Sequence, residues 1–342
     1  MTQPHPSDKP RIGITLGDLN GIGPEVIIKA LSDHRLHTLI TPVIYGSTKA
    51  LSFYRKLMNL EDFNYNVVKT KGQFFAKTIN VVNCWDEMIE INPGQPSRNT
   101  AKAALLSLKS AVEEVKAGFI DGFVTGPIDK NTIHGEDFPF QGHTEYLTQE
   151  FNAGESLMLM VGQDLKVGLV TEHIPVKEIP SFITRERVEL KIRLMELTLK
   201  KDFIISKPKI AVLGLNPHAG DEGLLGNEEN EIIKPVIQDL KTKGKLIFGP
   251  FPADGFFASG QHLKFDGIIA MYHDQGLVAF KTISFESGIN YTAGLPHVRT
   301  SPDHGTAYNL AGKNLASESS MRQAMYVASE IIKNRRLQLV ES

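Results

Sequence analysis

Cysteine and tryptophan are almost absent from this sequence, which contains one residue of each, Cys84 and Trp85, at neighbouring positions. A single cysteine cannot close a disulfide within the chain, so we expect a protein of a reducing, intracellular compartment. No basic residue adjoins Cys84 in the sequence, and a catalytic thiol needs such a neighbour to ionise. We therefore interpret Cys84 as a buried structural residue.

Long apolar segments and an excess of one charge are also missing. No apolar run is long enough to cross a bilayer, and the polar start, residues 1–10, lacks the apolar core of a secretion signal. The net charge of −2 gives no overall attraction to nucleic acid or to an anionic membrane. We expect a cytoplasmic protein with a short disordered start, and its 342 residues predict two domains rather than one.

The chain does contain an alternation of apolar runs with helical patterns. Runs that stop at turn residues predict strands at 11–16, 42–45, 122–125, 166–171, 210–215 and 267–271. Helices are predicted at 24–31, 100–117, 145–151 and 181–201. In the second of these, apolar residues fall at helical spacing on one face, and Asn99 or Thr100 is the expected cap. The alternation predicts an α/β fold with mostly parallel sheets covered by helices on both faces.

Three histidines, His173, His218 and His273, each follow the end of a predicted strand within a few residues. Ligands of parallel α/β folds bind outside the carboxyl ends of the strands, so these rings are placed where a site is expected. Neutral imidazole suits zinc and similar metals, and three protein ligands leave a position open for water or substrate. The alternative is three separate loop histidines that bind main-chain groups.

Other polar residues are candidates for binding an anion. His143 and Thr144 lie at the start of a predicted helix, where main-chain N–H groups attract anions, although Thr144 could instead cap that helix. Lys281 and Arg299, with Asn290 between them, are basic and polar candidates for a phosphate or carboxylate, and solvated surface charge is the alternative.

Two glycine-rich segments, at 17–25 and 303–313, also allow close approach of a ligand to the main chain. Neither has the spacing of the dinucleotide fingerprint G-x-G-x-x-G, and the first is equally interpreted as a tight turn.

Seven segments together resemble the 4-hydroxythreonine-4-phosphate dehydrogenase family, over nearly the whole chain. They are ITLGDLNGIGPEV at 14–26, TGPIDK at 125–130, GHTEYL at 142–147, GLNPHAGDEGLLGNEE at 214–229, GPFPADGFF at 249–257, MYHDQG at 271–276 and GLPHVRTSPDHGTAYNLAGK at 294–313. The first and last are also similar to strings of the isocitrate and isopropylmalate dehydrogenase superfamily. The resemblance implies two α/β domains with mostly parallel sheets around a central cleft, which bind NAD without the usual fingerprint.

The resemblance also implies the domains and the site residues. An NAD-binding domain is expected at 1–135 plus 290–342, and a metal-binding and dimerisation domain at 136–289. The metal ligands would be His173, His218 and His273. Substrate would be bound by His143, Thr144, Lys281, Asn290 and Arg299, with Lys281 and Asp254 as the catalytic candidates. The NAD-contacting residues would be Gly294, Leu295, His304, Gly305 and Gly312.

The implied activity is oxidation of 4-phosphohydroxy-L-threonine by NAD or NADP to 2-amino-3-oxo-4-phosphooxybutanoate. This product loses CO2 to give 3-amino-2-oxopropyl phosphate, in pyridoxal 5'-phosphate biosynthesis. The resemblance implies a homodimer with the active site at the subunit interface. A divalent metal is expected, zinc by its chemistry, with cobalt, nickel, manganese and magnesium as alternatives.

Three other functions remain open at this stage. A paralogous dehydrogenase of 4-phospho-erythronate or D-threonate 4-phosphate would share the metal, NAD and phosphate sites. A metallohydrolase would use the same histidines without NAD. A non-catalytic metal-binding protein would bind metal and form no NADH.

Overall fold

The computed structural model describes residues 9–140 and 142–341, and the expected disordered start falls almost entirely outside these ranges. The chain forms two compact units. Unit 1 comprises the chain up to Ala153 and again from Leu295, and unit 2 is Gly154–Gly294. The chain thus leaves unit 1 once and returns to it, with crossings after 153 and 294 where the sequence predicted 135 and 289.

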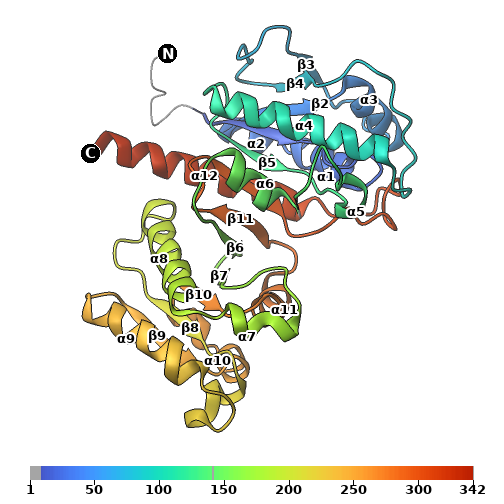
Figure 1. The fold of residues 1–342 in the computed structure, drawn as a ribbon. Helices are drawn as coiled ribbons and strands as arrows, with labels where there is room; N and C mark the ends of the chain where they lie inside the picture. Colours follow the sequence, from blue (N-terminus) through green and yellow to red (C-terminus); the bar gives the residue numbers. More distant parts are fainter. Residues whose placement is uncertain (1–8, 141, 342) are drawn as a thin grey trace. The chain divides into compact units, whose positions relative to one another are not determined.

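Unit 1 is built on a parallel sheet with the strand order β3-β4-β2-β1-β5-β12. Its strands are β1 (Arg11–Thr15), β2 (Thr41–Gly46), β3 (Tyr65–Val67), β4 (Ile79–Asn83), β5 (Gly122–Thr125) and β12 (Val298–Pro302). Its helices are α1 (Gly23–Leu31), α2 (His34–Leu39), α3 (Thr48–Leu57), α4 (Arg98–Lys116), α5 (Lys130–Ile133), α6 (His143–Glu150) and α12 (Ser319–Glu341). Figure 1 shows α4 lying along this sheet, where it packs on β1, β2 and β5.

Helix α4 confirms the predicted amphipathic helix and corrects its cap. The apolar face is buried as expected. The cap is Ser97, whose Oγ accepts a hydrogen bond from the Thr100 main-chain N–H at 3.2 Å, and not Asn99 or Thr100. The structure therefore begins the helix two residues earlier than predicted, at Arg98, because Ser97 satisfies a main-chain donor of the first turn.

Unit 2 combines parallel and antiparallel strands in the order β11-β6-β7-β10-β8-β9. The strands are β6 (Leu157–Val161), β7 (Lys166–Leu169), β8 (Ile210–Leu213), β9 (Ile247–Phe251), β10 (Gly267–Ala270) and β11 (Ile289–Ala293). The helices are α7 (Ile179–Phe182), α8 (Arg185–Lys201), α9 (Lys234–Thr242), α10 (Ala253–Ala258) and α11 (His273–Ser284), with the short turns η1 (Val176–Glu178), η2 (Pro217–Gly223), η3 (Glu229–Ile233) and η4 (Gln261–Lys264). Strands β7, β10, β8 and β9 are parallel to one another, so their carboxyl ends lie at one edge.

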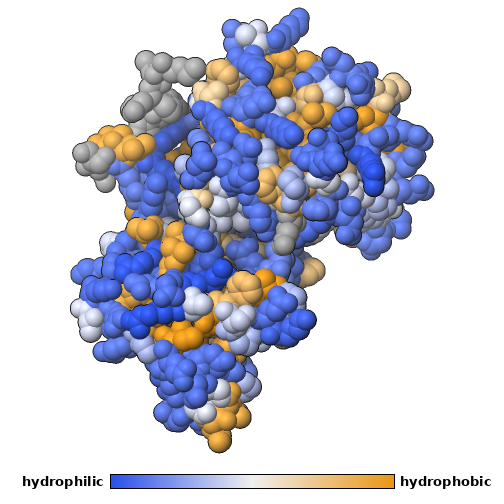
Figure 2. Space-filling model, in the orientation of Figure 1, coloured by the Kyte–Doolittle hydropathy of each residue, from blue (hydrophilic) through white to orange (hydrophobic). Residues whose placement is uncertain are grey.

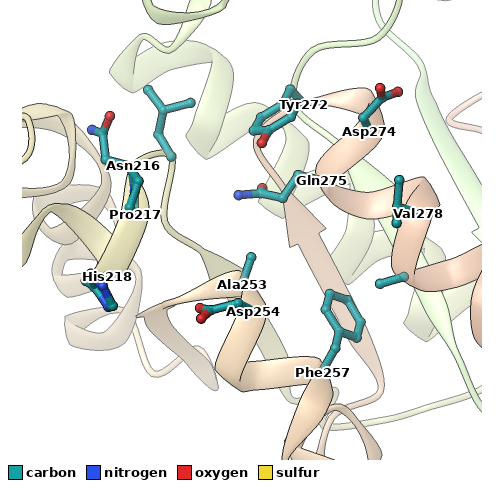
Figure 3. Close-up of a pocket in the computed structure, with 12 residues that line it drawn as sticks. Asn216, Pro217, His218, Ala253, Asp254, Phe257, Tyr272, Asp274, Gln275 and Val278 are labelled. Atoms are coloured by element: carbon teal, nitrogen blue, oxygen red, sulfur yellow. The ribbon is translucent and has the colours of Figure 1, made fainter.

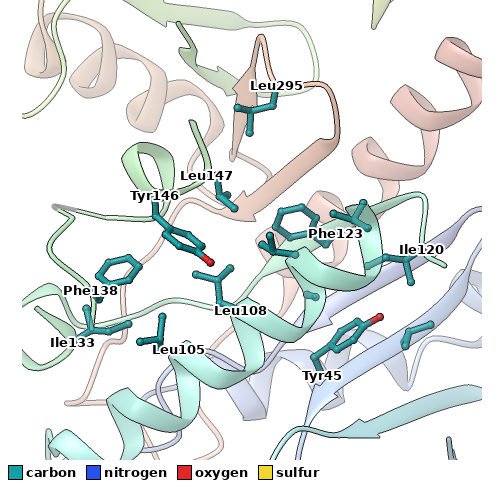
Figure 4. Close-up of a cluster of buried hydrophobic side chains, with 14 of the residues drawn as sticks. Tyr45, Leu105, Leu108, Ile120, Phe123, Ile133, Phe138, Tyr146, Leu147 and Leu295 are labelled. Atoms are coloured by element: carbon teal, nitrogen blue, oxygen red, sulfur yellow. The ribbon is translucent and has the colours of Figure 1, made fainter. Parts of the chain in front are cut away.

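Each unit has its own hydrophobic core. In unit 1, Figure 4 shows Leu105 and Leu108 of α4 facing Phe123 and Tyr146, in a buried cluster that also contains Leu295. In unit 2, a second cluster is formed by β6, β7, β8 and β10 together with Phe256 and Phe280. The fold class is therefore confirmed as α/β with mostly parallel sheets.

None of the helices in the described ranges has the length and apolar character needed to span a membrane. Cys84 is half-buried, and burial raises the pKa of its thiol to about 11. The thiol is therefore protonated at neutral pH, which agrees with a structural role.

Candidate functional site

The three expected metal ligands leave three neighbouring strands of unit 2. His173 follows β7, His273 begins α11 directly after β10, and His218 lies in η2 after β8. These strands stand side by side in the order β7-β10-β8 and are parallel. Their carboxyl ends therefore place all three histidines at the same edge of the sheet of unit 2.

The structure brings His173 and His273 together. Their ring centroids are 5.6 Å apart, and the ring planes differ by 42°. The His273 Nδ1 lies 2.8 Å from the Asp274 carboxylate, which can accept a hydrogen bond from a protonated Nδ1. That bond would leave Nε2 with a lone pair, the arrangement typical of a histidine that binds a metal.

His218 is exposed and lies in an unusual turn. Five consecutive residues, His218–Glu222, have positive φ angles between 43° and 83°, and only Gly220 is a glycine. Each of the other four costs about 1 kcal/mol in this left-handed region, so surrounding contacts must stabilise the turn. Within the described ranges, the three rings do not form a group whose ligand atoms all lie within 4.8 Å of one another.

A cavity of about 600 Å³ opens beside His218 in unit 2. Figure 3 shows His218 and Pro217 at one side of this cavity, Tyr272 and Asp274 at another, and Asp254 at the start of α10 between them. Its lining combines these polar groups with apolar side chains such as Phe257 and Val278. A pocket of this size and mixed character can hold a small polar molecule.

The remaining candidates of unit 2 lie on α11 and β11. Lys281 is half-buried on α11, and Asn290 is half-buried on β11. The Asn290 Oδ1 is inaccessible to solvent and has no hydrogen-bond partner among the residues that the structure describes. A buried acceptor without a donor costs free energy, which a ligand that donates a hydrogen bond would offset.

The candidate substrate residues of unit 1 include one buried cation, Arg299. Arg299 on β12 is 3% exposed, and its Nη2 and Nε donate to the Thr125 Oγ1 at 2.7 and 3.1 Å. Burial lowers the pKa of Arg299 to about 10, while Glu145 acts in the opposite direction. The guanidinium therefore remains charged at neutral pH.

His143 and Thr144 stand beside this cation in the first turn of α6. Burial, and then the charges of Arg299 and Lys130, hold the pKa of His143 well below its usual 6.5, so its ring is neutral and can both donate and accept a hydrogen bond. Gly142 precedes the helix and provides no side-chain cap. Thr144 lies inside the helix, so its alternative role as the cap is wrong. The first-turn N–H groups, the guanidinium and Lys130 together favour an anion.

The expected NAD segment is anchored to the loop between β1 and α1 and to the first turn of α1. Glu25 is fully buried and its carboxylate accepts hydrogen bonds from the main-chain N–H groups of Gly312 and Asn314. Asp18, also fully buried, accepts from the Asn20 main-chain N–H at 2.9 Å and from the Tyr308 hydroxyl at 3.0 Å. Burial raises the pKa of Asp18. The two glycine-rich segments of the sequence are thus adjacent at the carboxyl edge of the unit 1 sheet.

The five residues proposed to contact NAD differ in what they expose. The Leu295 side chain is 2% exposed and belongs to the core, so it would offer a ligand only its main chain. Gly294 and Gly312 have φ angles of 90° and 78°, and a Cβ on Gly312 would lie 2.7 Å from Pro93. His304 is half-buried with Nδ1 3.1 Å from the Gly305 carbonyl, and Gly305 is exposed.

Several residues of these two sites were not predicted from the sequence. The available signal was the position next to the candidate His273 for Asp274, and the place in the family segment TGPIDK for Lys130. Glu229 and Gln275 lie in the family segments 214–229 and 271–276, but nothing in the sequence indicates that Glu229 binds Leu215 or that Gln275 binds Gly214.

Comparison with known proteins adds a family to this geometry. Residues 38–328 match the family model described as pyridoxal phosphate biosynthetic protein PdxA. A relative from Bacteroides thetaiotaomicron, named 4-hydroxythreonine-4-phosphate dehydrogenase, is 51% identical over 329 residues, which cover 96% of this chain and 90% of the relative. A relative from Oceanobacillus iheyensis, provisionally named a D-threonate 4-phosphate dehydrogenase, is 40% identical and covers 95% of this chain and 98% of its own.

Solved structures show the same similarity. The crystal structure of 4-hydroxythreonine-4-phosphate dehydrogenase from Klebsiella pneumoniae is similar with a TM-score of 0.81 at 31% identity. The alignment covers 95% of this chain and 98% of that one. Coverage of this extent includes parts of both units.

Proposed function

Because this chain belongs to the family of the pyridoxal phosphate biosynthetic protein PdxA, a family of dehydrogenases, we propose that it oxidises 4-phosphohydroxy-L-threonine with NAD or NADP. The product would be 2-amino-3-oxo-4-phosphooxybutanoate, which loses CO2 to give 3-amino-2-oxopropyl phosphate. The single observation that carries this function is 51% identity, over nearly the whole length, to a relative with that name. The proposed place of action is the cytoplasm.

The proposed metal site is supported by its donor chemistry. Three imidazoles at one sheet edge suit a divalent ion such as zinc, which nitrogen ligands bind at about 2 Å. The centroid distance of 5.6 Å between His173 and His273 is compatible with two rings that face one ion. The Asp274 carboxylate at the His273 Nδ1 would orient that ring. His218 is the third proposed ligand, from the neighbouring strand end.

The proposed phosphate site is supported by the cation of unit 1. Arg299, the neutral His143 and the first-turn N–H groups of α6 offer several donors to one anion. Lys281 and Asn290 are proposed to bind the same substrate, the latter through its unpartnered Oδ1, which would accept a hydrogen bond from a substrate hydroxyl or amino group.

A bound metal would supply Lewis acidity at the substrate hydroxyl, and a bound nicotinamide would accept the hydride. The side chains of this chain would fix the substrate for that step. Arg299 and His143 would hold its non-reacting phosphate. Lys281 or Asp254 would take the hydroxyl proton. Gly294, Leu295, His304, Gly305 and Gly312 would line the dinucleotide site.

We propose that the active protein is a homodimer with the active site at the subunit interface, and that α11 contributes to that interface. Val278 and Phe285, on α11 and just after it, are 66% and 79% exposed, and Lys281 lies on the same helix. Figure 2 shows apolar residues exposed on several parts of the surface of unit 2. Exposure of several apolar side chains in one region costs a monomer free energy, because apolar surface is in contact with water. A second subunit that covered them would remove this cost.

Light scattering of the wild-type protein is expected to give the mass of two chains. Val278→Lys is expected to shift the measured mass toward that of one chain, because dimer formation would bury the lysine charge in the interface. An exposed glutamate on unit 1, Glu136, serves as the control with Glu136→Lys. A wild-type mass of one chain at micromolar concentration would contradict the dimer.

An NADH assay on a panel of substrates tests the activity. We expect rapid NADH formation with 4-phosphohydroxy-L-threonine and slow formation with D-threonate 4-phosphate and 4-phospho-erythronate. A chelator is expected to abolish NADH formation. Zinc, cobalt, nickel, manganese and magnesium are then added separately, and the ion that restores the rate identifies the metal.

The same panel separates the alternatives. Faster turnover of D-threonate 4-phosphate would assign the chain to the activity named for the Oceanobacillus relative, which is 40% identical. Hydrolysis of a substrate without NAD would favour a metallohydrolase. Metal binding without NADH formation on any substrate would contradict a dehydrogenase.

A further inference from the structure

Two polar side chains hold the turns that carry His218 and His273. Glu229, at the start of η3, is 1% exposed, and Gln275 lies in the first turn of α11. Glu229 binds main-chain groups after the end of β8. Gln275 binds main-chain groups after the ends of both β8 and β10. We propose that Glu229 and Gln275 are positioning residues for the histidine site, and this inference rests on the proposed metal function.

The Glu229 carboxylate is bound by the two residues that precede Pro217 and His218. Its Oε1 accepts hydrogen bonds from the main-chain N–H groups of Leu215 and Asn216, each at 2.7 Å. Its Oε2 accepts from the Asn216 side-chain Nδ2 at 2.9 Å. A buried carboxylate requires such donors, so the carboxylate and the turn fix each other.

The turn also wraps closely around this carboxylate. A Cβ on Gly220 would lie 2.7 Å from the Glu229 Oε2, and one on Gly214 would lie 3.1 Å from Oε1. Between these glycines the main chain enters the left-handed run that begins at His218. Because side chains disfavour that conformation, it needs contacts from its surroundings, and the Glu229 bonds to Leu215 and Asn216 fix the chain directly before it.

Gln275 joins the ends of β8 and β10, which are neighbours in the sheet. Its Oε1 accepts from the Met271 main-chain N–H, and its Nε2 donates to the Gly214 carbonyl, both at 2.7 Å. On the other side of β10, the Thr171 hydroxyl donates to the Met271 carbonyl at 2.8 Å. A continuous series of hydrogen bonds therefore crosses the three strand ends, each of which leads to one histidine.

A positioning role predicts a loss of metal affinity that loss of stability alone does not produce. Glu229→Gln keeps the size of the side chain but removes its charge and one acceptor. We expect about tenfold weaker Zn²⁺ affinity, at the low end of the effect of residues that orient metal ligands. The measurement is competition for Zn²⁺ with a chromophoric chelator, without substrate, together with the visible absorption spectrum of the Co²⁺-loaded protein.

Glu196→Gln is the matched control. Glu196 is another buried carboxylate of unit 2, with 8% of its surface exposed. It pairs with Lys200 on α8 at 2.5 Å and with Lys245, which follows α9, at 2.9 Å. We expect this variant to lower the melting temperature and to keep the wild-type Zn²⁺ affinity and Co²⁺ spectrum.

Gln275→Met, which keeps the length of the side chain without its amide, is the second variant and decides the matter if Glu229→Gln does not fold. Wild-type Zn²⁺ affinity in both variants, or an equal loss in Glu196→Gln, would overturn the positioning role. Wild-type protein that binds none of Zn²⁺, Co²⁺, Ni²⁺, Mn²⁺ and Mg²⁺ would refute the metal function and this inference together. Wild-type binding with unchanged variants would remove only the positioning role.

Discussion

Replacing His218 with alanine is expected to remove the bound metal and the dehydrogenase activity together, while the chain remains folded. The ring is exposed and lies outside the hydrophobic core of unit 2, so its loss removes little packing. A metal that stabilises charge at the reacting oxygen contributes several kcal/mol, so we expect the rate to fall about 10³-fold or more. The measurements are metal content after dialysis, NADH formation and circular dichroism.

His262→Ala is the matched control for this variant. His262 lies on η4, which precedes β10 in the chain, and its ring packs on Phe257. It should keep metal and activity. Full metal content in His218→Ala would restrict the ligands to His173 and His273, whose rings the structure already brings together at 5.6 Å. Loss of metal in both variants would indicate a general effect of histidine removal.

Much of the fold follows from the sequence because the central strands are continuous apolar runs. The predicted strand at 122–125 is β5 itself, and the one at 210–215 contains β8. Strand β12 was not predicted, because Arg299 and Pro302 interrupt its apolar pattern. Arg299 is nevertheless buried there, and the proposed phosphate site would account for its charge, which the sheet itself does not require. Local pattern and global fold disagree where function requires a charge.

The sequence predicts those parts of the candidate site that directly follow the ends of parallel strands. Parallel strands bring their carboxyl ends to one edge, so His173 and His273 could be expected near each other. The path of the chain at His218 could not, because non-glycine residues such as Ala219 and Asp221 rarely adopt positive φ angles. Glu229 binds the chain directly before this run, at Leu215 and Asn216, and these contacts form only in the folded unit. Tertiary contacts of this kind leave no periodic pattern in a sequence.

Replacing Arg299 with lysine is expected to raise the KM for the phosphorylated substrate about 100-fold, with a smaller change in kcat. The Thr125 hydroxyl fixes the guanidinium through Nε and Nη2, and a lysine amine cannot reproduce this planar fork. One lost hydrogen bond between charged groups costs about 1.5–3 kcal/mol, which corresponds to roughly 10–100-fold in affinity. Because the phosphate does not react, the loss falls mainly on binding. Steady-state kinetics and inhibition by inorganic phosphate measure it.

Arg336→Lys separates this effect from a general cost of replacing a buried arginine. Arg336 on α12 is 8% exposed, and it pairs with the Asp121 carboxylate at 2.8 Å, so we expect lower thermal stability and an unchanged KM. At the Nε and Nη2 of Arg299 the acceptor is the Thr125 hydroxyl, and burial lowers the pKa of Arg299 to about 10. A bound phosphate would offset that burial cost through its negative charge. An unchanged KM in Arg299→Lys, or an equal rise in Arg336→Lys, would place the phosphate elsewhere.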